Sequence, residues 1–375
     1  MNHLLYSYSL CVALPLMLFF GFYLLLARTP HKAIFANFLL SRRLMGTALL
    51  LLAANYFVHF YFEIRFLNVN AAILMNLLTY FLCYWLFSSA LTTLLDRFYI
   101  TRRRFSVHLF LWVLFSVLAT VVLFVLPKGI VQTVGLFAMA MWLVIYGIVL
   151  ARRLLLAYYR AVKLFKDSHS DDIGAYIRWM SIFTYWALFF GVGCGLLTFL
   201  PDEYVFIWIL SSVPFYIYLY CSYMNYLLFY EQVETAFELD MPSEEVLYEE
   251  VDEELIAPSY YTDITEKIMA WKEENGFVQP GLTIKELAEI LHTNRTYLSG
   301  YIKSAYQMSF RDWITELRLD YSKRLLAQNP ELTIANISEM SGFQSPSHFI
   351  RLFKEREDES PAKWRKVKEQ ETAAV

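Results

Sequence analysis

Two related stretches decide the fold of the last third of the chain. They read NRTYLSGYIK at residues 294–303 and SPSHFIRLFK at residues 345–354. When their ends are matched, Leu298 aligns with Phe349, and a second apolar pair follows four positions later, which is the spacing that seats a helix on a core. Each stretch follows a shorter helical pattern and a turn. A short helix, a turn and a second helix, given twice, predicts a tandem helix-turn-helix.

Start signals mark where these helices begin. Thr283 and Glu286 have the spacing of a capping box. Ser345 and Ser360 each precede a proline at a first helical position, where the missing N–H is not needed. The helix between the two units is expected over 309–326, a length of about 27 Å at 1.5 Å per residue. A helix of that length would hold two reading helices near the ~34 Å spacing of successive major grooves on one face of DNA.

Apolar residues dominate the rest of the chain. Hydrophobic residues make up 58% of it and charged residues 18%, whereas soluble domains have about 45–50% and about 25%. This composition excludes a wholly soluble globular protein and a disordered or collagen-like chain. Seven apolar stretches are long enough to cross a bilayer, which needs about 20 residues. They lie near residues 4–27, 44–62, 71–95, 105–126, 130–150, 177–200 and 204–230.

The distribution of charge divides the chain into three regions. Residues 1–230 carry 16 Lys and Arg against 7 Asp and Glu, residues 231–261 carry none against 11, and residues 262–375 carry 16 against 17. We therefore expect an all-α protein: a seven-helix transmembrane bundle over 1–230, an acidic linker over 231–261, and a cytoplasmic all-helical tandem helix-turn-helix domain over 262–375. The linker is expected to continue the last span as a helix to about Glu238.

The positions of the cations predict an orientation, because cytoplasmic loops retain Lys and Arg. One set of loops holds 14 cations, and the other set holds only Arg65 and Lys128. This bias places the first residues outside the cell, and seven spans then place everything after Tyr230 in the cytoplasm. The first span lacks the basic start and cleavage site of a signal peptide. A multi-pass protein of the cytoplasmic membrane is expected.

Residues 262–368 resemble the DNA-binding domain of the AraC/XylS family of bacterial transcription regulators. The residues that carry this resemblance run in order through both units: Leu287 to Leu291, Tyr297 to Ser299, Phe310 to Trp313, Leu317 to Leu319, Ala327, Ile334, Ile337, Gly342, Phe343, Phe349, Arg351, Phe353, Lys354, Ser360, Pro361, Trp364 and Arg365. The family usually has a glycine near Gln307 and another near Asp358, so the turn after each recognition helix departs from its pattern. The resemblance implies a reader of double-stranded DNA in a bacterial inner membrane.

The outward faces of the two reading helices supply the candidate DNA contacts. Base edges are met by the first outward residues of such helices, while cations and helix starts hold phosphates. Arg351 suits bidentate reading of guanine and Ile350 suits a thymine methyl group. The predicted base-reading residues, some of them supported by the family resemblance and His348 by it alone, are Arg295, Thr296, Ser299, Gly300, Ser347, His348, Ile350 and Arg351.

Phosphate contacts are expected from cations that flank these helices. The candidates are Lys303, Arg311, Lys354, Lys363 and Arg365. Because residues 262–375 carry a net charge of −1, we expect these five and the two reading arginines to cluster on one face. Two other interpretations stay open. An exposed Arg or Ser is also ordinary on a solvated helix, and His348 could instead pack near the start of its helix.

Polar residues within the spans are the candidates for signal perception. His59, Glu63 and Arg65 at the outer end of the second span predict polar anchors for a small-molecule ligand, and an interfacial aromatic belt with ordinary end charges is the alternative. A GxxxG pattern over 191–195 predicts close helix packing or dimerisation. No metal-ligand, cofactor or enzyme motif is recognisable in the sequence, so neither a cofactor nor catalysis is expected.

The sequence is best interpreted as a membrane-bound one-component transcription regulator. Its transmembrane domain would sense a signal, and its cytoplasmic domain would bind promoter DNA, in a protein that could form a homodimer. The alternatives are a transporter-like membrane domain whose DNA-binding domain regulates its own expression, and an anchor from which proteolysis releases the regulator. The acidic linker is either a solvated connector or an autoinhibitory segment in which Glu249, Glu250, Glu253 and Glu254 compete with phosphate.

Overall fold

The computed structural model describes residues 2–30, 32–197, 204–240 and 258–373, and their regular structure is helical. The chain divides into two compact units. The first contains residues 1–161 and 176–235, and the second contains residues 162–175 and 236–375. The second unit therefore takes in a short segment from the middle of the apolar region, which the charge pattern had assigned to the membrane domain.

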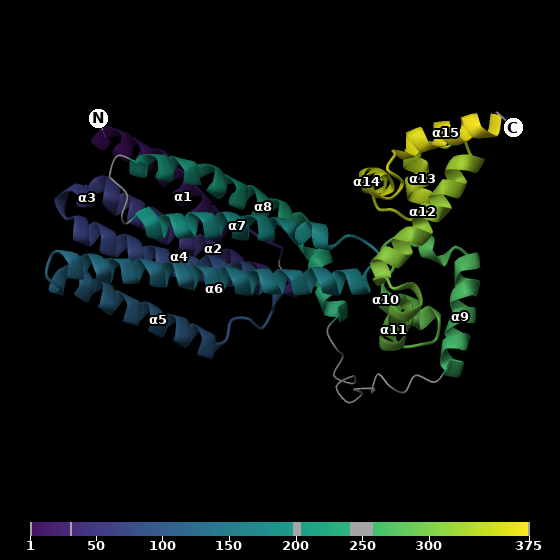
Figure 1. Cartoon of the computed structure of the whole chain (residues 1–375), viewed down its shortest axis with the longest axis horizontal. Helices are drawn as coiled ribbons and strands as arrows, with labels where there is room; N and C mark the ends of the chain where they lie inside the picture. Colours follow the sequence, from purple (N-terminus) through teal and green to yellow (C-terminus); the bar gives the residue numbers. More distant parts are fainter. Residues whose placement is uncertain (1, 31, 198–203, 241–257, 374–375) are drawn as a thin grey trace. The chain divides into compact units, whose positions relative to one another are not determined.

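Long helices laid side by side build the first unit, together with the four-residue helix α3 (Figure 1). They are α1 Asn2–Leu26, α2 Ala36–Tyr61, α3 Ile64–Leu67, α4 Val69–Leu95, α5 Arg102–Thr120, α6 Ile130–Ser168, α7 Gly174–Leu197 and α8 Val205–Asp240, the last residues of α6 and α8 belonging to the second unit. Two helices outrun the predicted spans. The apolar pattern of α6 was expected to end near Leu150, and α8 continues to Asp240, close to the expected end near Glu238.

Six helices among the described residues are long and apolar enough to cross a membrane. They run over Leu4–Leu26, Ala33–Tyr61, Val69–Leu95, Arg102–Val125, Ile130–Ser168 and Val205–Phe237. The remaining predicted span, near 177–200, corresponds to α7, which is not among the six, and its last residues lie outside the described part of the chain. A multi-pass membrane segment is thus supported, whereas the count of seven is not confirmed.

Close helix packing in the first unit depends on glycines. A Cβ at Gly46 of α2 would lie 3.0 Å from the carbonyl oxygen of Gly21 in α1. In the predicted GxxxG stretch, a Cβ at Gly193 would lie 1.8 Å from the indole of Trp208 in α8. This contact shows Gly193 packing within the chain. Near the end of α8, the Glu234 carboxylate is buried and accepts a hydrogen bond from Arg97.

The second unit has the predicted tandem arrangement. Its helices are α9 Pro258–Glu273, α10 Ile284–Ile290, α11 Arg295–Tyr306, α12 Phe310–Gln328, α13 Ile334–Met340, α14 Pro346–Glu357 and α15 Pro361–Ala373. One apolar core forms around α9, α10, α11 and the start of α12, and a second forms around the end of α12 and α13, α14 and α15. The 19-residue helix α12 is therefore shared by both helix-turn-helix units.

Local backbone chemistry explains why these helices begin and end where they do. The capping box of Thr283 and Glu286 forms as predicted. Gly342, in the turn before α14, has a φ of +82°, and a Cβ there would lie 2.3 Å from the carbonyl oxygen of Val278. Gln307 and Asp358, which follow the two reading helices, have φ values of 54° and 59°. This left-handed conformation is the one that glycine adopts most easily after a helix.

Candidate DNA-binding surface

Each reading helix has a capped start and one buried face. The Asn294 side chain accepts a hydrogen bond from the backbone N–H of Tyr297 at 2.9 Å, and Ser345 accepts one from that of His348 at 3.3 Å. Leu298 of α11 and Phe349 of α14 are fully buried, which confirms that the two helices are seated at equivalent positions. Helical spacing also predicts that Ala305 of α11 faces the core, and there the prediction is wrong, because Ala305 is exposed.

The reason for this difference is the larger side chain of Tyr306, the residue that follows Ala305. The side chain of Tyr306 stacks on Trp313 of α12, with ring centroids 5.4 Å apart. A methyl group is too small to bridge the gap that this aromatic side chain fills, so the apolar face of α11 ends on Tyr306. Trp313 in turn stacks on Trp271 of α9 at 5.8 Å.

The predicted base-reading residues lie on the sides of α11 and α14 that the core leaves open. The exposed ones are Thr296, Ser347, Ile350 and Arg351, and the half-buried ones are Arg295, Ser299, Gly300 and His348. Apart from its chain neighbours and the backbone of its own helix, no atom of the described residues lies within 4 Å of the position that a Cβ at Gly300 would take. The surface of α11 is therefore open there.

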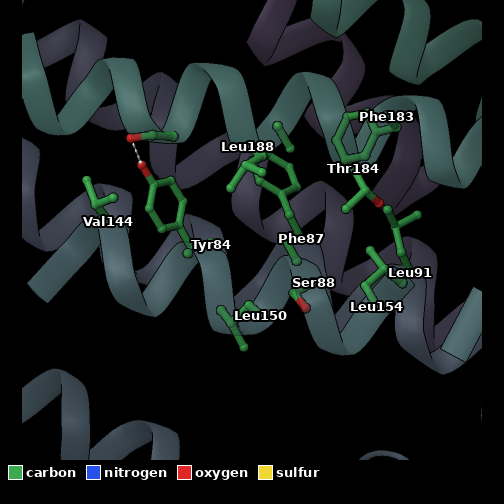
Figure 2. Close-up of a pocket in the computed structure, with 14 residues that line it drawn as sticks. Tyr84, Phe87, Ser88, Leu91, Val144, Leu150, Leu154, Phe183, Thr184 and Leu188 are labelled. Atoms are coloured by element: carbon green, nitrogen blue, oxygen red, sulfur yellow. Dashed lines mark hydrogen bonds between the residues drawn. The ribbon is translucent and has the colours of Figure 1, made fainter. Parts of the chain in front are cut away.

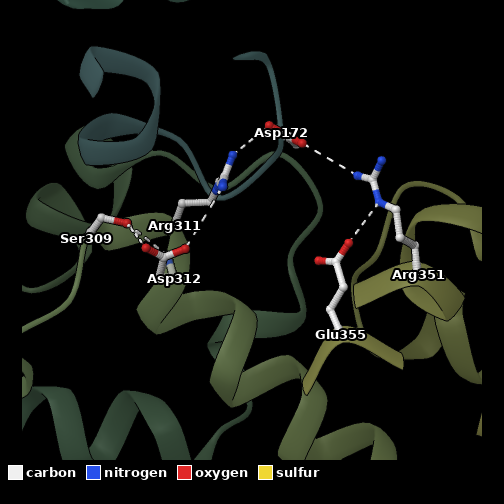
Figure 3. Close-up of polar contacts among 6 residues, drawn as sticks. All are labelled: Asp172, Ser309, Arg311, Asp312, Arg351 and Glu355. Atoms are coloured by element: carbon white, nitrogen blue, oxygen red, sulfur yellow. Dashed lines mark hydrogen bonds and ion pairs between the residues drawn. The ribbon is translucent and has the colours of Figure 1, made fainter. Parts of the chain in front are cut away.

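A short part of the chain contacts this side of both helix-turn-helix units. We call it the acidic segment, residues 167–172, and it connects α6 to α7. Figure 3 shows the Asp172 carboxylate between the guanidinium groups of Arg311 and Arg351. Arg311 Nη1 donates to Asp172 Oδ1 at 2.6 Å, and Arg351 Nη2 lies 3.6 Å from Oδ2. One carboxylate thus joins the start of α12 to the second reading helix.

The same segment contacts the first helix-turn-helix unit. Arg295 Nη2 donates to the Ser168 hydroxyl at 2.8 Å, and Lys303 Nζ lies 3.5 Å from Asp167 Oδ2. The backbone takes part as well, because the N–H of Ser170 donates to the Leu282 carbonyl at 3.0 Å. An isolated antiparallel bridge joins His169 to Thr283.

Asp171 makes a different kind of contact, with the buried Arg318 of α12. Arg318 Nη1 donates to Asp171 at 3.4 Å, while its other nitrogens donate to the Phe277 carbonyl at 2.8 Å and the Gln279 carbonyl at 2.6 Å. Burial raises the pKa of the Asp171 carboxyl, and the Arg318 charge opposes that rise. Gln344, in the turn before α14, also donates to Asp171. Arg318 is thus held by backbone carbonyls in addition to the acidic segment.

The expected cluster of cations forms in part. Arg295, Lys303, Arg311 and Arg351 all contact the acidic segment. Two residues on α15 have other partners: Lys363 pairs with Glu359 at 2.7 Å, and Arg365 donates to the Pro330 carbonyl at 3.3 Å. Lys354 is exposed on α14.

Sequence reasoning missed Asp171, Asp172 and Gln344. The signal that could have found the first two is a run of acids in a loop otherwise rich in Lys and Arg. The linker acids Glu249, Glu250, Glu253 and Glu254 lie outside the described residues.

The residues predicted to anchor a ligand lie in α2, in the turn that follows it and in α3. His59 is buried, with its two ring nitrogens hydrogen-bonded to Tyr6 and Asn76, each at 2.9 Å. Glu63 is exposed, with a φ of 48°, and Arg65 is half-buried. His59 thus belongs to a polar network that links α1, α2 and α4. Within the described residues, no group of His, Cys, Asp and Glu could hold a metal ion.

A pocket in the first unit lies among α4, α6 and α7 (Figure 2). Its lining is mostly apolar, with a few hydroxyl groups. Tyr84 donates to the Gly191 carbonyl at 2.6 Å, and Thr184 donates to that of Met180. The Ser88 hydroxyl is buried without a hydrogen-bond partner among the described residues. Such a group is costly to leave unpaired in an apolar site.

Comparison with known proteins finds relatives of the helix-turn-helix part of the second unit. A family described as "Helix-turn-helix domain" matches residues 287–367. An uncharacterized HTH-type transcriptional regulator of Bacillus subtilis, YobQ, is 43% identical over 72 residues, which are 19% of this chain and 30% of the relative. The Msm operon regulatory protein of Streptococcus mutans is 34% identical over 85 residues, 23% of this chain and 30% of the relative.

A third relative is the melibiose operon regulatory protein of Escherichia coli, which is 30% identical over 89 residues, 24% of this chain and 29% of the relative. The chain therefore matches less than a third of the length of each of these relatives, all of which are named as regulators and not as enzymes. No solved structure matches the chain significantly. The matched part is the tandem helix-turn-helix.

Proposed function

Because residues 287–367 form an AraC-type helix-turn-helix domain, we propose that the chain is a membrane-bound transcription regulator that binds promoter DNA sequence-specifically. In this proposal, α1, α2 and α4 to α8 cross the cytoplasmic membrane, the first residues lie outside, and the domain over 262–375 lies in the cytoplasm. DNA search is then confined to the membrane surface. A homodimer would double the length of the DNA site.

One observation carries the proposal. Two helices with capped starts, α11 and α14, are held by the shared helix α12, and each leaves polar and cationic residues on its open side. The 19 residues of α12 span about 28 Å at 1.5 Å per residue. That length suits two helices that enter successive major grooves of one DNA face.

Genome-wide mapping of DNA bound by the intact protein in its own cells tests this function. The expected result is a small set of enriched promoters that share a sequence motif, and enrichment should be lost in a variant with Arg351→Ala and Arg295→Ala. The matched control is Arg324→Ala with Lys366→Ala, because both are exposed cations of the same domain outside the two reading helices. No shared motif in any form of the protein would overturn the proposal.

The sensing role rests on the pocket among α4, α6 and α7. An apolar cavity with an unpaired hydroxyl at Ser88 suits an apolar, membrane-dissolved molecule that carries one hydrogen-bonding group. Filling the pocket with Ala187→Phe should fix promoter output at one level whatever the growth medium. The control is Ile182→Phe, on an exposed part of the same helix. Equal responses of both variants and the parent to the medium would exclude the pocket as the sensor.

A further inference from the structure

We propose that the acidic segment, residues 167–172, and promoter DNA are mutually exclusive occupants of one surface, so that the segment holds the regulator off DNA until it is withdrawn. The inference rests on the proposed function, because it assigns the DNA-binding surface a second partner within the same chain. The partner is defined by its chemistry: a short loop with three carboxylates, Asp167, Asp171 and Asp172.

The first argument is that Asp172 binds the guanidinium groups of Arg311 and Arg351, which DNA binding would also use. A carboxylate and a phosphate are both anions that accept paired N–H donors from arginine. Arg351 points its Nη2 at Asp172 and its Nε at Glu355 of its own helix, at 3.6 and 3.9 Å. Engaging a guanine or a phosphate with the same nitrogens requires Arg351 to leave Asp172.

The second argument is that the segment reaches both helix-turn-helix units at once. Ser168 and Asp167 meet Arg295 and Lys303 of α11, while Asp172 meets Arg351 of α14. These three cations were predicted as DNA contacts from their positions on the reading helices, and Arg351 also from the family resemblance. DNA lying across α11 and α14 would need the space that the segment occupies.

The third argument concerns how firmly the segment is held. The Arg311–Asp172 pair is shielded, with side chains 19% and 26% exposed, so solvent screens it less than an ordinary surface ion pair. The contacts of Asp167, Ser168 and Asp172 with the two helix-turn-helix units are nevertheless polar, and an open cavity borders Asp172, His348 and Leu352. Polar contacts beside an open cavity suit an association that forms and dissolves.

Asp171 has a separate role, which is to stabilise the fold. It pairs with the buried Arg318, and breaking a buried ion pair by removing one partner destabilises the fold. A test of the inference must therefore leave Asp171 in place and change the residues that meet the open surface.

The position of the segment in the chain suggests how it is withdrawn. It is the direct connection between α6 and α7, which both line the pocket with the unpaired Ser88 hydroxyl. In this proposal, a molecule that occupies the pocket would act on the segment through the chain connection that α6 and α7 provide.

The charge test uses the full chain in lipid nanodiscs and a pool of DNA duplexes with a randomised centre. Asp167→Asn with Asp172→Asn should tighten binding of the selected duplex about 10-fold. The control is Asp320→Asn with Glu331→Gln, which changes the net charge of the same unit equally at two exposed positions of the helix-turn-helix domain. About the same gain in both double variants would mean that only the overall charge matters, and the inference would fail.

A covalent lock gives a second, independent test. Residues paired in an antiparallel bridge have the Cα spacing that a disulfide requires, so His169→Cys with Thr283→Cys, in a chain whose native cysteines are serine, should form a bond on oxidation. The oxidised protein should lose DNA binding at least 10-fold, and reduction should restore it. Binding that is equal in both states would overturn the inference alone, whereas failure of every form to select any sequence would overturn the proposed function.

Discussion

Arg351 is proposed both to contact a DNA base and to bind the acidic segment. It is half exposed on α14 and contacts Asp172. Arg351→Ala should weaken binding to the selected duplex by about 1–3 kcal/mol and relax the preference at one base pair, as expected for a bidentate base contact. Because the substitution also removes a contact of the acidic segment, it should be measured with Asp167→Asn and Asp172→Asn present, by titration of the selected duplex and its single-base variants.

Arg356, one turn further along α14, is the matched control. It pairs with Glu316 of α12 at 3.1 Å. Arg356→Ala should leave the base preference unchanged. If Arg351→Ala lowers affinity equally for every duplex variant, Arg351 contacts a phosphate and not a base.

The residues after the two reading helices predict a gain in stability. Gln307 and Asp358 adopt left-handed conformations, which cost a residue with a Cβ roughly 1–2 kcal/mol. Gln307→Gly and Asp358→Gly should each raise the free energy of unfolding of the second unit by about 1 kcal/mol, measured by urea denaturation of the full chain. Ser299→Gly, within α11, is the opposite case and should destabilise the domain. A loss of stability at both turns would show that the side chains make contacts worth more than the strain.

At the scale of elements, the sequence predicted the starts of the helices better than their ends. Polar caps are local, so Thr283, Asn294 and Ser345 identify helix starts without tertiary information. Hydropathy instead reports where a helix leaves the bilayer, so the apolar pattern of α6 was expected to end near Leu150, although the helix continues through the charged Arg152 and Arg153 to Ser168. Those last residues lead into the acidic segment, which was consequently assigned to the membrane domain.

Docking of the acidic segment should depend on pH through His169. Burial lowers the pKa of His169 to about 4, with Arg295 adding to the effect and Glu286 opposing it. The free segment should have the ordinary value of about 6.5. The docked state therefore binds a proton less readily, and its stability is complete above pH 6.5 and is lost as the pH falls toward 4.

At pH 5.5, one unit below the ordinary value, the expected loss is about 1.4 kcal/mol, so the full chain should bind its selected duplex about 10-fold more tightly than at pH 7.5, relative to a His169→Asn variant. His348 is present in both proteins. Burial, Arg351 and Arg311 lower its pKa and Asp172 raises it, and its contribution cancels in the comparison. Burial raises the pKa of Asp171, which acts with the opposite sign, and its contribution cancels as well because Asp171 is present in both proteins. Equal pH dependence in both proteins would contradict the prediction.

At the scale of the whole molecule, the tandem helix-turn-helix could be predicted because its signals are local and repeated. The contact of Asp172 with Arg351 could not, because it joins residues far apart in the sequence, and an acidic residue in a loop carries no pattern that names its partner. For the same reason the exposed cations of α11 and α14 suggested DNA contacts, while the segment that competes for them became visible only in the folded unit.

The proposed mechanism fixes the topology of the membrane domain and predicts that α7 crosses the bilayer. The acidic segment and residues 258–375 must lie on the same side, and the chain between them contains α7 and α8, so both helices must cross or neither can. The apolar length of α8 favours crossing. Single cysteines introduced into a chain without its native cysteines can be labelled in intact cells with a membrane-impermeant maleimide.

Tyr204→Cys, just before α8, and Glu63→Cys should be labelled in intact cells, because both residues are exposed and expected outside. Thr101→Cys and Glu331→Cys should be labelled only after the membrane is permeabilised, since both lie on the expected cytoplasmic side. Protection of Tyr204→Cys together with labelling of Glu63→Cys would show that α7 and α8 do not cross. Labelling of Glu331→Cys in intact cells would place the helix-turn-helix units outside the cell, where they could not reach a promoter.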